Sequence, residues 1–296
     1  MFDTTTSTFQ FVFFGIAVLT VVLPKIGLRK GIPVLILLGR WLRWVLFAAI
    51  FSYTLKSLEI SFRPDWVHFI TGLAVWFMLE TGYYWIAIKA LSRSEIPLFP
   101  SFKLNADGDE WPADPLLIET REWLRKEDFK RLSALKAELF EGTFLRASIY
   151  ESTDQLTRLQ ILFIPKRKDG ATACYTLSTN GEDGRRLITE NLFLPFGGYY
   201  PEGWNIVRKP LIGSLKGLLK LHGQRLSKSS LKAIPFEGEP LDELNDQQRI
   251  LEHFNLEIGF LNPRQFQEEI GKISYDGRYR LWKEMWLLAY LGRSVS

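Results

Sequence analysis

The side chains that most often carry chemistry are few and scattered in this sequence. The three histidines, His68, His222 and His253, lie far apart, and none has an acidic or nucleophilic partner at catalytic spacing. The single cysteine, Cys174, sits in a strand-like run, which is typical of a small core residue rather than a nucleophile. One cysteine excludes an intrachain disulfide and any multi-cysteine zinc or iron–sulfur site.

Catalytic and nucleotide-binding motifs are absent from the sequence. It holds no P-loop, no G-x-G-x-x-G, no H-E-x-x-H, no G-x-S-x-G and no EF-hand loop. The segment from Gly213 to Gly217 matches only a fragment of a phosphate-binding loop. We therefore expect no cofactor and no metal, and the sequence assigns no reaction.

Glu80 is the acidic residue that lies well inside an apolar run, Trp66 to Leu91. A carboxylate inside a membrane is costly unless it is paired or protonated. Arg40 and Arg43 lie at the start of a neighbouring run, and an arginine one turn inside the membrane boundary can reach towards the depth of Glu80. We expect a membrane ion pair of Glu80 with Arg43 or Arg40. The alternatives are a protonation-linked or ion-conducting role, a glutamate facing a watery crevice, or a shifted span.

Glu80, Arg40 and Arg43 lie in or beside three apolar runs near the start of the chain. They correspond to spans at about residues 8–26, 38–58 and 66–90. A span needs about 20 mostly apolar residues to cross the hydrocarbon. The second run meets that length only if Arg40 and Arg43 reach back to the headgroups. We predict a bundle of three transmembrane helices in residues 1–93, and two spans with one interfacial helix as the alternative.

The basic residues around these runs are distributed unevenly. No Lys or Arg precedes the first run, and five follow it, at positions 25, 29, 30, 40 and 43. Basic loops remain on the cytoplasmic side of a membrane. We expect an integral protein of the bacterial cytoplasmic (inner) membrane, with the N-terminus outside and the C-terminal domain cytoplasmic. The first run lacks the basic start and cleavage site of a signal peptide, so we expect it to remain as an anchor.

The net charge of the chain belongs to its first third. The sequence holds 37 Lys and Arg residues against 33 Asp and Glu residues, a net charge of +4. Residues 1–96 contain nine basic and five acidic residues, which account for the whole excess. The basic balance is therefore a sign of membrane topology, and we expect no nucleic acid as a partner.

The remaining 200 residues are sufficient for an independent core. Their patterns predict a soluble α+β domain, in which an antiparallel β-meander of about four strands is flanked by helices, followed by a helical C-terminal tail. We expect the following divisions: a linker at 94–114, the cytoplasmic α+β domain at 115–226, a second linker at 227–240 and the helical C-terminal region at 241–296.

The elements of this domain have recognisable local signals. Asp114 and Pro115 predict a helix start, and leucines at helical spacing extend the predicted helix, or pair of helices, to Gly142. Four strand candidates follow at 143–150, 157–164, 171–178 and 185–194. Hairpin turns are predicted at Lys168-Asp169-Gly170 and Asn180-Gly181.

Two groups of aromatic residues form candidate ligand or partner surfaces. The first lies in a loop of glycines and aromatic residues and comprises Tyr199, Tyr200 and Trp204. This loop can stack on a ligand or cover the sheet. The second shares one face of the last predicted helix and comprises Tyr279, Trp282 and Trp286. That face packs on the sheet, or binds a partner or the membrane interface.

A basic helix is predicted from Pro210 to Leu226, with a wide apolar face. The inner leaflet of a membrane is negative and attracts basic groups. We expect contacts with anionic lipid from Arg208, Lys209, Lys216, Lys220 and Arg225. Alternatively, the basic face pairs with the acidic stretch from Glu237 to Asp246.

Two classes of function follow from these features. The leading hypothesis is a membrane-anchored cytoplasmic interaction or scaffold protein, whose partners are the lipid bilayer and a protein or a second copy of the chain. The alternative is a membrane-bound enzyme that acts on a lipid or lipid-linked substrate, because a basic helix and a glycine–aromatic loop lie near the membrane. Transport is a third hypothesis, although three spans are few for a transporter protomer.

Overall fold

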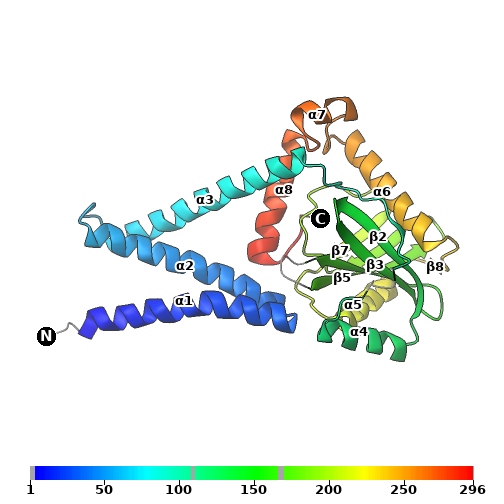
Figure 1. Cartoon of the computed structure of the whole chain (residues 1–296), viewed down its shortest axis with the longest axis horizontal. Coiled ribbons are helices and arrows are strands. Elements are labelled where there is room, and N and C mark those ends of the chain that lie inside the picture. Colours follow the sequence, from blue (N-terminus) through cyan, green and yellow to red (C-terminus); the bar gives the residue numbers. More distant parts are fainter. Residues whose placement is uncertain (1–3, 108–110, 166–169, 296) are drawn as a thin grey trace.

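A computed structural model describes residues 4–107, 111–165 and 170–295 of the chain. Three long helices extend from one side of a sheet domain, and a helical C-terminal region joins the two parts (Figure 1). The long helices are α1 (Thr4–Lys30), α2 (Pro33–Ser57) and α3 (Asp65–Arg93). The predicted turn at Lys168-Asp169 lies outside the described residues.

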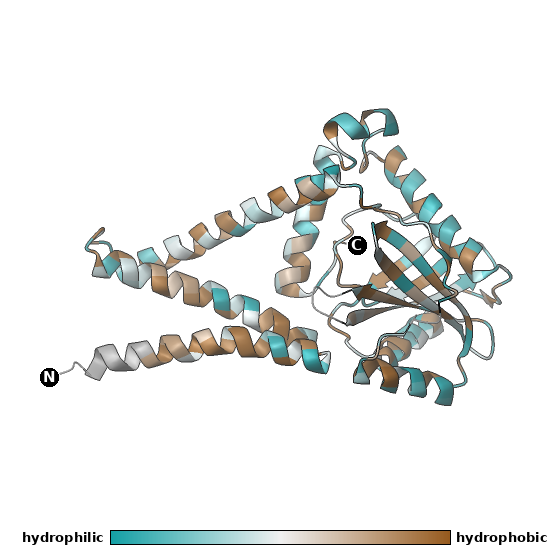
Figure 2. Ribbon diagram, in the orientation of Figure 1, coloured by the Kyte–Doolittle hydropathy of each residue, from teal (hydrophilic) through white to brown (hydrophobic). Residues whose placement is uncertain are grey.

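Two of these helices, α1 and α2, are long and apolar enough to cross a membrane. Figure 2 shows hydrophobic residues along both of them, whereas α6 and α7 in the C-terminal region are largely hydrophilic. The helix α3 has 29 residues but is less apolar than α1 and α2. The chain thus has two apolar N-terminal helices that point to association with a membrane.

Glycines let the long helices approach closely. A Cβ on Gly72 of α3 would lie 2.8 Å from the Cα of Ala48 on α2, and a Cβ on Gly39 would meet the ring of Pro24 on α1. Gly31, with φ of +63°, ends α1, and Pro33 occupies the first turn of α2. The α1–α2 connection is therefore a tight turn between two antiparallel helices.

The sheet has eight strands and is mixed. The strands are β1 (Lys103–Leu104), β2 (Lys130–Phe140), β3 (Thr143–Glu151), β4 (Arg158–Pro165), β5 (Ala171–Gly181), β6 (Arg186–Glu190), β7 (Trp204–Arg208) and β8 (Ala233–Ile234). The order is β1-β2-β3-β4-β5-β6-β7, and β8 pairs with β5. Neighbouring strands are antiparallel except β6 and β7, which are parallel. Both segments predicted as linkers thus contribute a short strand, β1 and β8.

The helix predicted from Asp114 to Gly142 is shorter than expected. It is α4 (Pro115–Lys126), and the leucines that follow belong to β2. Register shifts occur in β2 between Arg131 and Ser133 and between Glu138 and Phe140. These shifts break the strict alternation of a strand, so Leu132, Leu135 and Leu139, which are three and four positions apart as on a helix face, pack into one cluster with Ala137. Gly142 lies in the β2–β3 hairpin turn.

Helices cover both faces of the sheet. On one face, α4 and α5 (Leu215–Lys228) contribute Leu124 and Leu218 to a core with Leu159, Ile161 and Leu177. On the other face, α6 (Pro240–Glu257) contributes Leu244 to a core with Leu135, Ala147 and Ile149.

The turn predicted at Asn180-Gly181 lies slightly later in the chain than expected, because the amide of Gly181 donates to the carbonyl of Arg185.

The C-terminal region returns to the long helices. After a 3-10 turn, η1 (Arg264–Phe266), and α7 (Gln267–Ile270), the helix α8 (Tyr275–Trp286) continues into a π-helical turn, η2 (Leu287–Leu291). Ile273 donates its amide to Ser92 at the end of α3, and Tyr290 reaches Glu80 in the middle of α3. Hence α8 runs antiparallel to α3 and crosses to α2 (Figure 1).

Candidate functional site

The carboxylate of Glu80 accepts hydrogen bonds from four aromatic side chains. The indole nitrogens of Trp76 and Trp44 lie 2.9 Å and 3.2 Å from Oε2, and the hydroxyl of Tyr84 lies 2.7 Å from Oε1. The hydroxyl of Tyr290 also donates to Oε2. A carboxylate has about four acceptor positions, so these donors satisfy it completely. The donors come from α2, α3 and η2, and the group therefore joins three elements.

The aromatic donors take the place of the predicted ion pair. In the part of the chain that the structure describes, neither Arg40 nor Arg43 pairs with Glu80. Arg43 is exposed, and the Arg40 guanidinium lies 6.0 Å from the ring centroid of Phe193. Glu80 instead has uncharged donors, one of them 210 positions away in the sequence.

The side of α8 that faces away from Glu80 is attached to the sheet by a buried cluster of polar side chains around Arg208. Its Nε lies 2.6 Å from Glu190 of β6, its Nη1 lies 2.6 Å from Glu284 of α8, and its Nη2 donates to the hydroxyl of Tyr200 at 2.7 Å. Glu284 also accepts from the amide of Gly197 at 2.7 Å. The helix α8 thus contacts buried polar groups on both sides.

The protonation of this buried group follows from its surroundings. Burial acts to lower the pKa of the Arg208 guanidinium, but Glu190 and Glu284 outweigh it, and the pKa is raised. Burial raises the pKa of Tyr200, and the nearby Glu190 acts in the same direction. Arg208 therefore stays charged and Tyr200 stays neutral. The group is a structural ion pair network and not an acid–base pair.

Two of the predicted lipid contacts are engaged elsewhere. Arg208 is only 5% exposed, and Arg225 of α5 donates to the carbonyl of Ile188 and, at 2.7 Å, to the side chain of Asn205. The other three are exposed: Lys209, Lys216 and Lys220. Arg208 is buried and Arg225 is half-buried, and each satisfies polar groups at the β6–β7 edge of the sheet.

The alternative pairing of the basic helix with the acidic stretch also differs from the structure. Glu243 of that stretch pairs with Arg158 of β4 and, at 2.8 Å, with Arg186 of β6. Within the described ranges, no basic residue of α5 forms an ion pair with residues 237–246. The helix α5 lies on the opposite face of the sheet from α6, which separates the two sets of charges.

The glycine–aromatic loop covers the junction between the sheet and the C-terminal helices. Asn255 of α6 binds the amide and the carbonyl of Tyr199, at 2.8 Å and 2.9 Å. The Arg280 guanidinium carbon lies 3.7 Å from the Tyr199 ring centroid. Tyr200 packs against Phe196 with ring centroids 5.2 Å apart. Tyr199 and Tyr200, which were candidates for binding a ligand, are therefore engaged in contacts within the protein.

The aromatic face of the last helix packs on the long helices rather than on the sheet. Trp286 contacts Trp44 of α2 and Tyr84 of α3, with ring centroids 5.7 Å and 5.6 Å apart. Trp282 stacks on Tyr279, which is half exposed. Trp282 and Trp286 are half-buried, whereas Tyr279 is half exposed, and the sequence does not say which elements this face contacts.

His222 of α5 is a buried structural residue. Its ring nitrogens lie 3.1 Å from the hydroxyl of Thr179 and 2.9 Å from that of Thr189, and its side chain is 1% exposed. Burial, assisted by the charge of Arg225, lowers its pKa from 6.5 to about 4. The neutral ring therefore joins β5, through Thr179, to β6, through Thr189.

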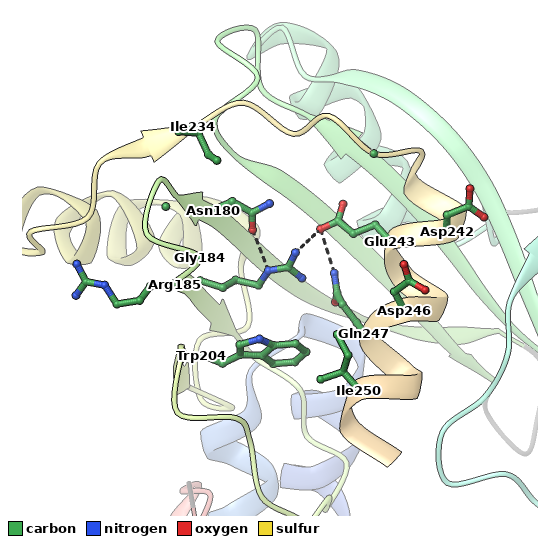
Figure 3. Close-up of a pocket in the computed structure, with 13 residues that line it drawn as sticks. Asn180, Gly184, Arg185, Trp204, Ile234, Asp242, Glu243, Asp246, Gln247 and Ile250 are labelled. Atoms are coloured by element: carbon green, nitrogen blue, oxygen red, sulfur yellow. Dashed lines mark hydrogen bonds and ion pairs between the residues drawn. The ribbon is translucent and has the colours of Figure 1, made fainter. Parts of the chain in front are cut away.

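A pocket of about 450 Å³ opens between the β5–β6 hairpin and the first half of α6 (Figure 3). Its polar floor is a connected network. Arg186 donates through Nε to Asn180 at 2.8 Å and through Nη2 to Glu243 at 2.8 Å, and Gln247 donates to Glu243 at 3.1 Å. Trp204 lines the pocket instead of joining the covered loop. We call this site the α6 pocket.

Sequence reasoning missed the α6 pocket because its walls come from distant segments. The turn residues Asn180 and Gly181 and the aromatic Trp204 were recognised separately, but nothing in the sequence indicated that they lie next to α6.

Across the described ranges, no group of three or more His, Cys, Asp or Glu side chains is placed to hold a metal ion. Comparisons with protein-family models, curated proteins and solved structures found no match for this chain.

The first prediction concerns the hydrogen bond between Glu80 and Tyr290. We expect Glu80→Gln and Tyr290→Phe to be strongly non-additive, with a coupling of about 1–3 kcal/mol, because Tyr290→Phe removes the donor and Glu80→Gln removes the charge that strengthens the hydrogen bond. Unfolding titrations in mild detergent measure this coupling. Glu80→Gln with Arg43→Gln is the matched control and should be additive. Additive effects of the first pair would contradict a direct contact.

The second prediction concerns His222 and acid. The folded state keeps the ring neutral, whereas the unfolded chain binds a proton below pH 6.5. Stability is therefore complete above that pH and is lost by up to about 3 kcal/mol as pH falls towards 4. We expect the melting temperature in detergent to fall more between pH 7 and pH 5 in the native protein than in His222→Gln. Equal falls would show that His222 is not the responsible group.

Proposed function

We propose that this chain is a membrane-anchored interaction protein whose sheet domain is held in a fixed orientation on three transmembrane helices. The observation that carries the proposal is the double attachment of α8. Tyr290 in η2 binds Glu80 of α3, and Glu284 of α8 binds Arg208 of the sheet. A domain held in this way presents the same surface relative to the membrane at all times, which favours the binding of a partner.

The third span in this proposal is α3. A carboxylate is tolerated inside a membrane when protein donors satisfy it, and the four donors to Glu80 do so. Apolar residues on the helix surface are available to lipid, and they include Met78, Leu79, Tyr83 and Ile86. These features support an α3 that crosses the membrane beside α2, in spite of its lower hydropathy.

The proposed contact with anionic lipid is limited to the start of α5. Gly213, just before α5, packs on Gly31 and Pro33 in the α1–α2 turn. That turn would lie at the cytoplasmic surface in the predicted orientation. Lys209 and Lys216 are exposed next to it and are the residues that we propose to contact lipid headgroups.

The competing hypothesis, an enzyme acting on a lipid-linked substrate, has weaker support. The buried arginine and glutamate side chains are paired with one another around Arg208 and around Arg158. The α6 pocket lies next to β8 and the first half of α6, on the side of the domain away from the long helices (Figure 1). A lipid headgroup at the membrane surface would not reach a pocket placed there.

The third prediction tests topology with single cysteines. The natural Cys174 is 4% exposed, and burial raises its pKa to about 11, so it contributes no background labelling. We expect a membrane-impermeant maleimide to label Arg63→Cys, in the α2–α3 connection, in intact cells. Ser227→Cys, on α5, should be labelled only after permeabilisation. Labelling of Ser227→Cys in intact cells would exclude the proposed orientation.

The fourth prediction tests the interaction itself. A photo-crosslinking amino acid placed at Phe144, on the β2–β3 hairpin, or Ile250, on α6, should yield discrete protein adducts in cells, because both side chains are exposed on the sheet domain. The same amino acid at Tyr83 of α3 is the control and should mark lipid or a second copy of the chain. The absence of protein adducts at both domain positions would refute a role in protein interaction.

A further inference from the structure

We propose that the α6 pocket receives a lysine or arginine side chain from a partner protein. The inference rests on the proposed interaction function and names the chemistry of the partner. It is carried by three properties of the pocket: its size, its apolar walls, and an excess of negative charge at its rim.

The pocket has the size and lining of a binding site. Its volume of about 450 Å³ lies within the usual range for ligand sites, roughly 300–1,000 Å³. The apolar walls include Trp204 of β7, Ile234 of β8 and Ile250 of α6, and Ile250 is 48% exposed. Figure 3 shows these three side chains around the polar floor. An inorganic ion would make no use of such walls.

The floor of the pocket contributes no net charge. Glu243 pairs with Arg186 and Arg158, and Arg158 also pairs with Glu151 at 3.0 Å. Two cations and two anions thus neutralise one another in a largely buried layer. A ligand that enters the pocket therefore responds to the charges at the rim.

The rim carries more negative than positive charge. Asp242 is exposed and forms no ion pair with any residue that the structure describes. Asp246 pairs only with Arg249, and both partners are more than half exposed, so that pair is weak. Arg185, on the opposite wall, pairs with Asp183 at 2.5 Å, and both partners are about half exposed, so Asp183 offsets its charge without burying it. The unbalanced group at the rim is a carboxylate, which favours a cation.

Lysine and arginine side chains fit both properties at once. Their aliphatic stems pack on apolar surface while the charged end remains at a polar edge. In this pocket the stem would lie along Trp204 and Ile250, and the charged end would reach Asp242 and Asp246. The elements β8 and α6, which contribute to the lining, lie on the side of the domain away from α1, α2 and α3 (Figure 1), where a soluble partner would have access.

The test uses the full chain in lipid nanodiscs and calorimetric titration with two synthetic probes, an alternating lysine–leucine hexapeptide and an alternating glutamate–leucine hexapeptide. We expect only the lysine peptide to bind, with affinity that falls as salt is raised. The double change Asp242→Asn with Asp246→Asn should weaken binding by about tenfold or more. Glu268→Gln, an exposed acid on α7, is the matched control and should bind normally.

Several outcomes would overturn the proposal. These are no binding of the lysine peptide, equal binding of both peptides, or equal affinities of the double variant and the Glu268→Gln control. Loss of a homo-oligomer in the double variant would assign the pocket to a second copy of the chain instead. Protein adducts from Phe144 without peptide binding would leave the interaction function intact and reject only the basic side chain as its ligand.

Discussion

A half-buried carboxylate and a buried guanidinium must both be satisfied by one short helical segment, and the arrangement of the molecule depends on this constraint. Glu80 lies among apolar helices, and Arg208 lies at the edge of the sheet. Each would be costly without partners, and residues 284–290 supply a partner to each. The position of α8 is therefore determined from both sides, and with it the position of the sheet relative to α2 and α3.

The magnitudes show why this segment matters. Removing one member of a buried ion pair costs about 3–5 kcal/mol, which is a large part of the roughly 5–15 kcal/mol that stabilises a typical domain. The exposed pairs, such as Lys56 with Asp65, contribute far less because solvent screens them. Aromatic packing of Trp286 with Trp44 and Tyr84 adds to the attachment. The connection between the two parts of the molecule thus contributes substantially to the stability of the whole chain.

The sequence predicted the features that depend on local periodicity. The first two apolar runs form the helices α1 and α2, as predicted. The later part of the chain folds into a domain of strands and helices, which was also predicted. It did not predict β2, because the leucines of this strand are spaced as on a helix face. Two register shifts in the strand accommodate that spacing. Nor did it predict the partners of Glu80, the burial of Arg208 or the α6 pocket. Each of these joins segments far apart in the chain, and a single sequence contains no signal for which distant donor meets which acceptor.

The place of α8 in the chain has a consequence for biosynthesis. A growing polypeptide folds from its N-terminal side, so α3 and the sheet are complete before residues 275–291 leave the ribosome. During that interval Glu80 lacks the hydroxyl of Tyr290, and Arg208 lacks the carboxylate of Glu284. The two parts of the protein become one unit only when synthesis has passed Tyr290. A nascent chain that stops earlier leaves both polar groups incompletely paired, which gives cellular quality control a feature by which to distinguish it.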